Sequence, residues 1–389
     1  MPEITVSLDI QYFILITALL ILPKVLLRFG VPTGISSLAL GTITALSLGW
    51  FAEGQVIPIL STLGITSLFL FAGLEVDFSE LKEDSNVLIR HLLKAFVFIL
   101  LSTMLIYFGF GFDMQTSIVL TLALTTPSTG FILNSINAYN FEATQKHWIK
   151  SKAISHEIIA LIILFFAIKS DSLVNLGTSL LALIGLIVTL PIIFKYFLKV
   201  IAPFSPDSEA TFMILIALLA GVATKAIGTY YLVGAFIAGV VAAQFRHFVS
   251  TENSEKMLYA VSFFASLFIP FYFYKGGLSL GSSELTWNGA IYGLLFFAIF
   301  VPLRYLSVIL SIRWFLPECW DGRKEISISL MPTLIFGLVI STILKDRFGV
   351  SDDIVFGIVL YSILTSILPA IRFKKAPPDV YDTALVKYQ

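Results

Sequence analysis

The sequence predicts an all-α polytopic membrane protein with 13 transmembrane helices. Of its 389 residues, 57% are hydrophobic and only 13% are charged, and the mean hydropathy is +0.93. A soluble domain carries about 25% charged residues, so most of this chain must be solvated by lipid. Apolar segments of spanning length recur along the chain, and Lys and Arg concentrate in alternate loops.

Composition also excludes several classes of protein. Lys and Arg together number 25, as do Asp and Glu, so the absence of net charge argues against a nucleic-acid partner. Cys319 is the only cysteine, which excludes a disulfide framework and a cysteine metal site. The N-terminal residues include Glu3 and Asp9 but no Lys or Arg, and therefore lack the basic start of a signal peptide.

Short loops containing Gly, Pro, Asp or Lys separate the 13 apolar segments. The expected segments are residues 9–28, 32–52, 55–78, 86–110, 115–137, 150–169, 172–199, 208–226, 229–245, 258–280, 287–314, 325–345 and 352–371.

The distribution of basic residues orients these segments. With the N-terminus outside, the odd-numbered loops and the C-terminal tail face inside, and they hold 18 of the 25 Lys and Arg residues, including Lys152. The even-numbered loops hold five, and Lys94 and Arg304 fall within segments. This bias follows the positive-inside rule. We therefore expect the C-terminus inside, with residues 1–372 as a transmembrane domain and 373–389 as a short cytoplasmic tail.

Helix-breaking residues interrupt the fifth and twelfth segments near their middles. The fifth contains TTPSTG (125–130) and the twelfth contains SLMPTLIFG (329–337). Proline removes a backbone donor and frees carbonyls within the membrane. The two segments are seven apart, which is the offset of inverted repeats formed by helices 1–6 and 8–13. Interrupted segments at matching positions of two halves indicate the binding site of a transporter.

Two charges lie at the same depth as these interruptions. Glu157 follows His156 within the sixth segment, and Arg304 lies within the eleventh. The helical rise places both charges, Pro127 and Pro332 roughly 10–15 Å from the inner ends of their segments. An ionisable residue at this depth is costly and indicates a functional site.

The chemistry of this layer suits a monovalent cation. Glu157 can supply the negative charge, while Thr126, Ser128 and carbonyls of the broken helix can supply neutral oxygens. The same carboxylate can bind a proton, so competition for it would couple the two flows. Thr125, Ser155 and Thr333 are expected to support the site, as are the two prolines and Arg304. A zinc enzyme would require a second His four residues after His156, where the sequence has Ala160 instead.

Several stretches together resemble the cation:proton antiporter 2 family of bacterial sodium/proton and potassium/proton exchangers. They are FLFAGLEVDF (70–79), TTPSTG, YLVGAFIAGVVAA (231–243) and FIPFYFYKGGLSL (268–280), and Arg304 falls where members carry a buried Lys or Arg. The resemblance spans essentially the whole chain. It implies a multi-pass protein of the bacterial inner membrane and a homodimer with interleaved dimerisation and core subdomains. It also implies that the two broken helices cross within the core, and that access alternates by an elevator-like motion.

The resemblance also assigns the central pair. Members usually carry Asp-Asp, Asn-Asp or Gln-Asp where this chain has His156-Glu157, so Glu157 inherits the ion-binding role. His156 could carry a second proton. A nearby Arg304 would disfavour its charged form, which favours electroneutral exchange.

We therefore expect an antiporter rather than an enzyme, exchanging Na⁺ for H⁺ without a cofactor. K⁺/H⁺ exchange is the alternative, and Li⁺ is a further candidate cation. A cation-coupled organic-anion symporter and a transport-inactive sensor are other possibilities. Regulation by a nucleotide-binding domain would require a separate subunit.

Overall fold

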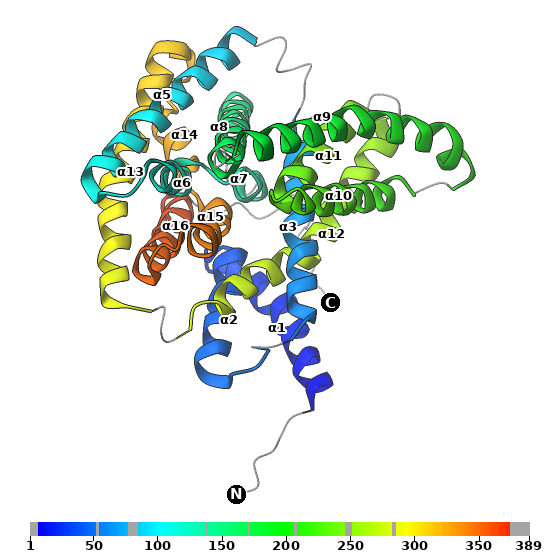
Figure 1. The fold of residues 1–389 in the computed structure, drawn as a ribbon, viewed down its shortest axis with the longest axis horizontal. Helices are drawn as coiled ribbons and strands as arrows, with labels where there is room; N and C mark the ends of the chain where they lie inside the picture. The colour runs from blue at the N-terminus through cyan, green and yellow to red at the C-terminus, as the bar shows by residue number, and fades with distance from the viewer. Residues whose placement is uncertain are drawn as a thin grey trace, which may run out of the picture.

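The computed structural model describes residues 7–51, 54–76, 85–136, 139, 141–169, 172–205, 208–245, 251–281 and 285–373. The elements assigned within these ranges are all helices (Figure 1). They are α1 (Leu8–Arg28), α2 (Thr33–Ile43), η1 (Thr44–Leu48), α3 (Val56–Leu74), α5 (Ser85–Phe110), α6 (Met114–Thr125), α7 (Thr129–Ile136), α8 (Ala143–Lys169), α9 (Leu173–Tyr196), η2 (Phe197–Ile201), η3 (Ala202–Phe204), α10 (Glu209–Ala226), α11 (Tyr231–Phe245), α12 (Thr251–Leu278), α13 (Trp287–Phe315), η5 (Pro317–Cys319), α14 (Arg323–Ser329), α15 (Leu334–Phe348) and α16 (Asp352–Arg372).

Each of the 13 apolar segments coincides with a helix or with a pair of helices. Among the described residues, 11 helical stretches are long and apolar enough to cross a membrane, and Thr33–Leu48 and Tyr231–Phe245 are shorter apolar helices. The chain is thus an all-helical, multi-pass membrane protein. The 13 crossings, the repeats and the orientation remain predictions. Residues 77–79 of the FLFAGLEVDF stretch and 374–389 of the expected tail lie outside the described residues.

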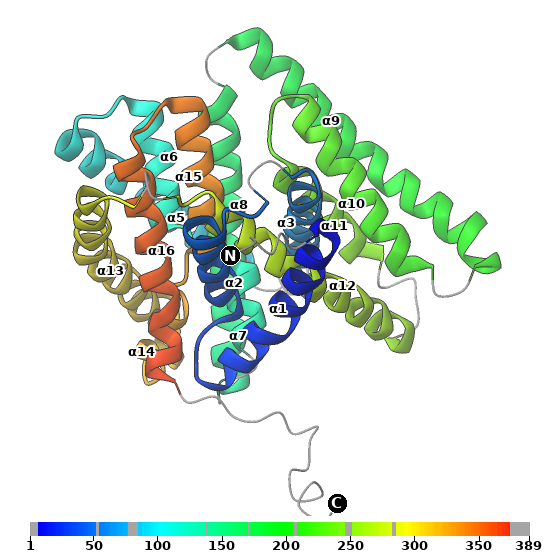
Figure 2. The ribbon, with the colours of Figure 1, turned by 90° about the horizontal axis from the view of Figure 1, so that it is seen from below.

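The helices form two groups that are interleaved in sequence. In one group α3 packs against α10, α11 and α12, while α2 joins α1 to α12. In the other, α5 packs on α6 and α8, and α15 packs between α6 and α16, which also contacts α13. Both views place α9–α12 at one end of the molecule and α13–α16 at the other (Figure 2). Helices α7 and α8 connect the groups through contacts with α3 and α9.

Glycines allow α3 and α11 to approach closely. A Cβ atom added to Gly73 would lie 2.4 Å from the carbonyl oxygen of Phe236, and one added to Gly239 would lie 2.3 Å from that of Leu70. Both distances are far below van der Waals contact, so the two backbones touch where side chains would otherwise separate them. The small residues of the GAFIAG run (234–239) therefore serve helix packing.

Helix α8 begins earlier than the hydropathy of its sequence suggests. The expected segment starts at residue 150, whereas α8 starts at Ala143 and includes the polar run TQKHWIK. Its Gln and two Lys residues form helices readily even though they are not apolar. Lys152, which the charge count assigns to an inner loop, lies within α8 and within the expected segment 150–169.

Candidate ion-binding site

Two helix interruptions meet at one point in the fold. Helix α6 ends at Thr125 and α7 begins at Thr129, while α14 ends at Ser329 and α15 begins at Leu334. The amide of Ser128 donates a hydrogen bond to the carbonyl of Pro332 across the two breaks, at 2.8 Å. Pro332 has no N–H to donate, but its carbonyl accepts the bond from Ser128 and thereby joins the two breaks. The sequence correctly predicts that both helices break and that the breaks come together.

Ser128 also supplies the N-terminal cap of α15. Its hydroxyl accepts hydrogen bonds from the amides of Ile335, at 3.0 Å, and Phe336, at 3.2 Å. These first-turn amides have no partner within their own helix, and the preceding Thr333 makes no side-chain cap. Ser128 was expected to bind the ion through its hydroxyl. In the structure that hydroxyl is instead engaged by two buried amides.

Arg304 occupies the opposite helix ends. Its guanidinium donates to the carbonyls of Leu330, at 2.7 Å, and Met331, at 2.9 Å, which directly follow α14. It also donates to the Tyr361 hydroxyl at 3.1 Å, and that hydroxyl donates to the Leu124 carbonyl of α6 at 2.6 Å. The buried Arg304 guanidinium thus contacts the C-terminal end of α14 directly and that of α6 through Tyr361. Positive charge is favourable at both helix ends. The partners of Arg304 are thus backbone carbonyls and the Tyr361 hydroxyl. The ion pairs found among the described residues do not include Arg304.

Glu157 lies buried against the first break. It projects from α8, has 2% of its surface exposed, and its carboxylate lies against the amide and hydroxyl of Thr129. Glu157 Oε2 and the hydroxyls of Thr126 and Thr129 are buried oxygens without hydrogen-bonding geometry to any described partner. Buried polar atoms normally have partners, so unsatisfied oxygens at one break mark a place for a ligand. A carboxylate with neutral hydroxyl oxygens matches the chemistry of a monovalent cation site.

Thr129 is the residue that the sequence interpretation missed. It belongs to the same TTPSTG stretch as Thr126 and Ser128, and it opens α7. The stretch contains three hydroxyl residues after Thr125, and the sequence does not reveal which of them faces the carboxylate. In the structure Ser128 links the two breaks and Thr129 lies beside Glu157, while the ion-binding role of each hydroxyl stays a prediction.

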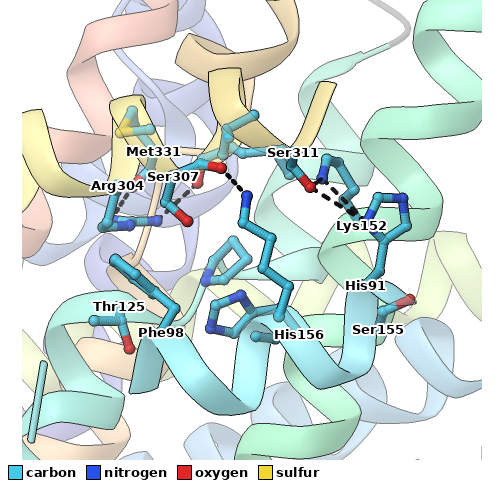
Figure 3. A pocket seen from close by; sticks show the side chains of 15 residues that line it. His91, Phe98, Thr125, Lys152, Ser155, His156, Arg304, Ser307, Ser311 and Met331 are labelled. Atoms are coloured by element: carbon cyan, nitrogen blue, oxygen red, sulfur yellow. Dashed lines mark hydrogen bonds between the residues drawn. The ribbon is translucent and has the colours of Figure 1, made fainter. Parts of the chain in front are cut away.

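His156 faces a different space from its neighbour. It lines a cavity of about 60 Å³ together with Thr125, Pro127, Ser155 and Arg304, whereas Glu157 is not among the lining residues (Figure 3). Successive residues of a helix point about 100° apart, which explains this separation. The Nε2 atom of His156 is buried without a described hydrogen-bond partner. The two residues expected to act as a pair therefore lie in different places: the Glu157 carboxylate is at the first break, and the His156 imidazole lines the cavity.

The remaining supporting residues have their hydroxyls engaged. Thr125 donates to the carbonyl of Thr121 at 2.8 Å, and Ser155 donates to that of Ser151 at 2.6 Å, so both bond to their own helices. Thr333 lies 3.0 Å from the Thr365 hydroxyl and 3.3 Å from that of Ser362, on α16. The hydroxyl hydrogens of Thr125 and Ser155 are thus used within their own helices, and the Thr333 hydroxyl is within hydrogen-bonding distance of α16.

The crossing of two interrupted helices beside a buried carboxylate is the arrangement of a secondary transporter. The family described as "sodium/hydrogen exchanger, transmembrane" matches residues 14–374, and the chain belongs to this family. Its members are transporters and not enzymes, and the multi-pass architecture is consistent with the plasma membrane.

Individual relatives agree with this assignment. The putative Na⁺/H⁺ antiporter YjbQ of Bacillus subtilis is 25% identical over 91% of this chain, which spans 60% of that protein's length. The probable Na⁺/H⁺ antiporter 3 of Methanocaldococcus jannaschii is also 25% identical, over 93% of this chain and 95% of its own. Among solved structures, the sodium proton antiporter MjNhaP1 of Methanocaldococcus jannaschii superposes with a TM-score of 0.68 at 16% identity. That match covers 92% of this chain and 94% of that one, and it supports the fold.

Proposed function

We propose that this protein is a secondary active antiporter that exchanges a monovalent cation for protons at Glu157. The observation that carries the proposal is the group of buried oxygens at the α6–α7 break: Glu157 Oε2, the Thr126 hydroxyl and the Thr129 hydroxyl. The family match and the Na⁺/H⁺ antiporter relatives support exchange of this type.

Competition for one carboxylate couples the two flows. The Glu157 carboxylate binds either a proton or a cation, because the negative charge that attracts the cation disappears on protonation. Thr126 and Thr129 supply neutral oxygens to the bound cation. The second break is less suited to bind the ion, because Arg304 already occupies the Leu330 and Met331 carbonyls. The Arg304 charge would also repel a cation there.

The transport cycle rests on the expected domain organisation. The α5–α8 and α13–α16 group contains the two broken helices and serves as the moving core, and the α1–α3 and α9–α12 group serves as the dimerisation domain of a homodimer. The core carries the loaded carboxylate across the membrane in an elevator-like motion. The membrane domain crosses 13 times, with the N-terminus outside and residues 373–389 inside. These features follow from the family resemblance and the positive-inside pattern.

Sodium is the proposed cation, with potassium and lithium as alternatives, and the exchange is electroneutral. Electroneutrality is favoured because His156 shares its cavity with Arg304, whose charge opposes a second proton on the imidazole. The transported ions are the only small ligands that the exchange requires, so no cofactor is proposed.

Antiport in proteoliposomes tests the proposal. The full chain is reconstituted, a pH gradient is imposed, and Na⁺, Li⁺ and K⁺ are added in turn while an internal dye reports pH. We expect a cation-evoked pH change that is abolished in Glu157→Gln and is largest for Na⁺. A response that is unchanged in Glu157→Gln would exclude this carboxylate. Charge movement evoked by a sodium jump at zero potential would exclude electroneutral exchange.

A further inference from the structure

The cavity that His156 lines is strongly basic. It lies between α5, α8, α13 and the two helix breaks, and its charged lining residues include Lys94, Lys152 and Arg304 (Figure 3). His91 and His156 also line it, and among the described residues no Asp or Glu does. Three basic side chains therefore converge on a small space within the membrane domain, and none of the described residues that face it is acidic.

The lysines are held by neutral groups. The Lys152 ammonium donates to the Ser311 hydroxyl at 2.7 Å and lies 3.4 Å from Nδ1 of His91. The Lys94 ammonium donates to the backbone carbonyl of Ser307. An ammonium carries three donor hydrogens, so these contacts leave donors on both lysines for a further ligand. The histidines add a further polar group, because Nε2 of His91 is buried and without a described hydrogen-bond partner.

Electrostatics indicates the charge of such a ligand. The ion pairs found among the described residues, Lys150–Glu75 and Lys345–Asp352, involve none of the cavity residues. A basic side chain is costly to insert within the membrane, and like charges that face one cavity also repel each other. An anion placed between the basic side chains would offset both the cost of inserting them and their mutual repulsion.

The size of the cavity limits the ligand to a small ion. At 60 Å³ the cavity has room for about four to six waters, at about 10–15 Å³ of cavity volume for each. This accommodates one halide-sized ion with a water, but not a gluconate or a larger organic acid.

We propose that this cavity binds a small inorganic monovalent anion, with chloride and bromide as its probes. The anion is held by the ammonium groups of Lys94 and Lys152, with Arg304 and the histidines completing a positive environment. This site is separate from the proposed cation site, since Glu157 does not line the cavity. Its occupancy can be measured whether or not the chain exchanges cations.

Anomalous diffraction from crystals of the full chain grown in bromide tests the site directly. We expect an anomalous peak within the cavity, in contact with the Lys94 and Lys152 ammonium groups. A map without a peak there at bromide concentrations of about 100 mM would overturn the proposal, because sites with millimolar affinity are then occupied.

Thermal stability in solution provides a second test. Apparent Tm is measured in detergent with sodium gluconate, sodium chloride or sodium bromide at equal ionic strength. We expect the halides to raise Tm in the wild type and in Lys195→Gln, an exposed lysine of α9, but not in Lys94→Gln or Lys152→Gln. A halide effect that persists in both cavity variants would contradict the assignment. If those variants do not fold, the bromide map of the wild type decides alone.

Discussion

The amide of Ser128 donates a hydrogen bond to the carbonyl of Pro332, at 2.8 Å. This bond joins the α6–α7 break to the α14–α15 break. The Ser128 hydroxyl strengthens the link by capping α15 through Ile335 and Phe336. The two interruptions therefore form one structural unit, and Glu157 and Thr129 lie on its first-break side.

Replacing Ser128 by Ala should destabilise this crossing. The substitution leaves two buried amides without an acceptor, and each unsatisfied donor costs about 1–3 kcal/mol. We expect a clear fall in apparent Tm in detergent and reduced transport. Ser155→Ala is the matched control, because its buried hydroxyl bonds only to its own helix at Ser151. Equal Tm values for the two variants would contradict the capping role.

Replacing Thr129 by Val should weaken cation binding while the fold is retained. Valine keeps the shape of threonine but removes one neutral oxygen beside Glu157, and loss of about 1 kcal/mol corresponds to a roughly fivefold weaker affinity. The apparent KM for sodium should rise accordingly, and Thr126→Val should act in the same direction. Thr125→Val is the control, since that hydroxyl bonds to Thr121. A similar rise in KM in all three variants would argue against selective coordination.

A methyl group at Gly239 should disrupt the contact between α3 and α11. The added Cβ would lie 2.3 Å from the Leu70 carbonyl, and overpacking of this kind costs about 1–3 kcal/mol. Gly239→Ala is therefore expected to lower Tm. Gly185→Ala in α9 serves as the control, because a Cβ there meets nothing within 4 Å. If both alanine variants melt at the wild-type temperature, the close approach of the helices is wrong.

Asp113 should contribute a pH-dependent cap to α6. Its carboxylate accepts a hydrogen bond from the Thr116 amide at 3.0 Å. Burial alone would raise the pKa of Asp113, but hydrogen bonds from the Thr116 hydroxyl and from nearby amides outweigh it and lower the pKa below its ordinary value. The stabilisation is therefore present above the ordinary pKa of the unfolded chain and disappears as the pH falls through the lowered pKa of the folded one.

The comparison of wild type with Asp113→Ala tests this dependence. Loss of an N-cap costs about 1 kcal/mol, so the variant should melt at a lower temperature near neutral pH. The difference in Tm should shrink as the pH is lowered below the ordinary aspartate value. If the difference in Tm between wild type and Asp113→Ala grew on acidification, the expected direction of the pH dependence would be contradicted.

The sequence predicts much of this architecture, because its strongest signals are local. Long apolar segments indicate the helices, and proline in the middle of a segment indicates an interruption. Glu157 is recognisable because a carboxylate in an apolar helix is costly. Side-chain direction is a different matter, since it depends on the tertiary packing around each break. The sequence accordingly assigns an ion-binding hydroxyl to Ser128, which caps α15, and does not single out Thr129.

The basic cavity illustrates the same difficulty. Lys152 reads as a loop residue because it lies next to Lys150 and before an apolar run. In the structure Lys152 lies well inside α8, which starts at Ala143, and it donates a hydrogen bond to Ser311 of α13. Hydropathy marks the apolar part of a helix and not its full length, so a polar first half escapes it.

Proton release on sodium binding tests the central claim most directly. Calorimetric titration of the purified full chain with Na⁺, in buffers of different ionisation enthalpy, counts the protons displaced. Competition at Glu157 predicts release that approaches about one proton per bound ion as the pH is lowered, and that is lost in Glu157→Gln but retained in Glu318→Gln, an exposed glutamate of η5. Sodium binding without proton release, or release that persists in Glu157→Gln, would contradict the account.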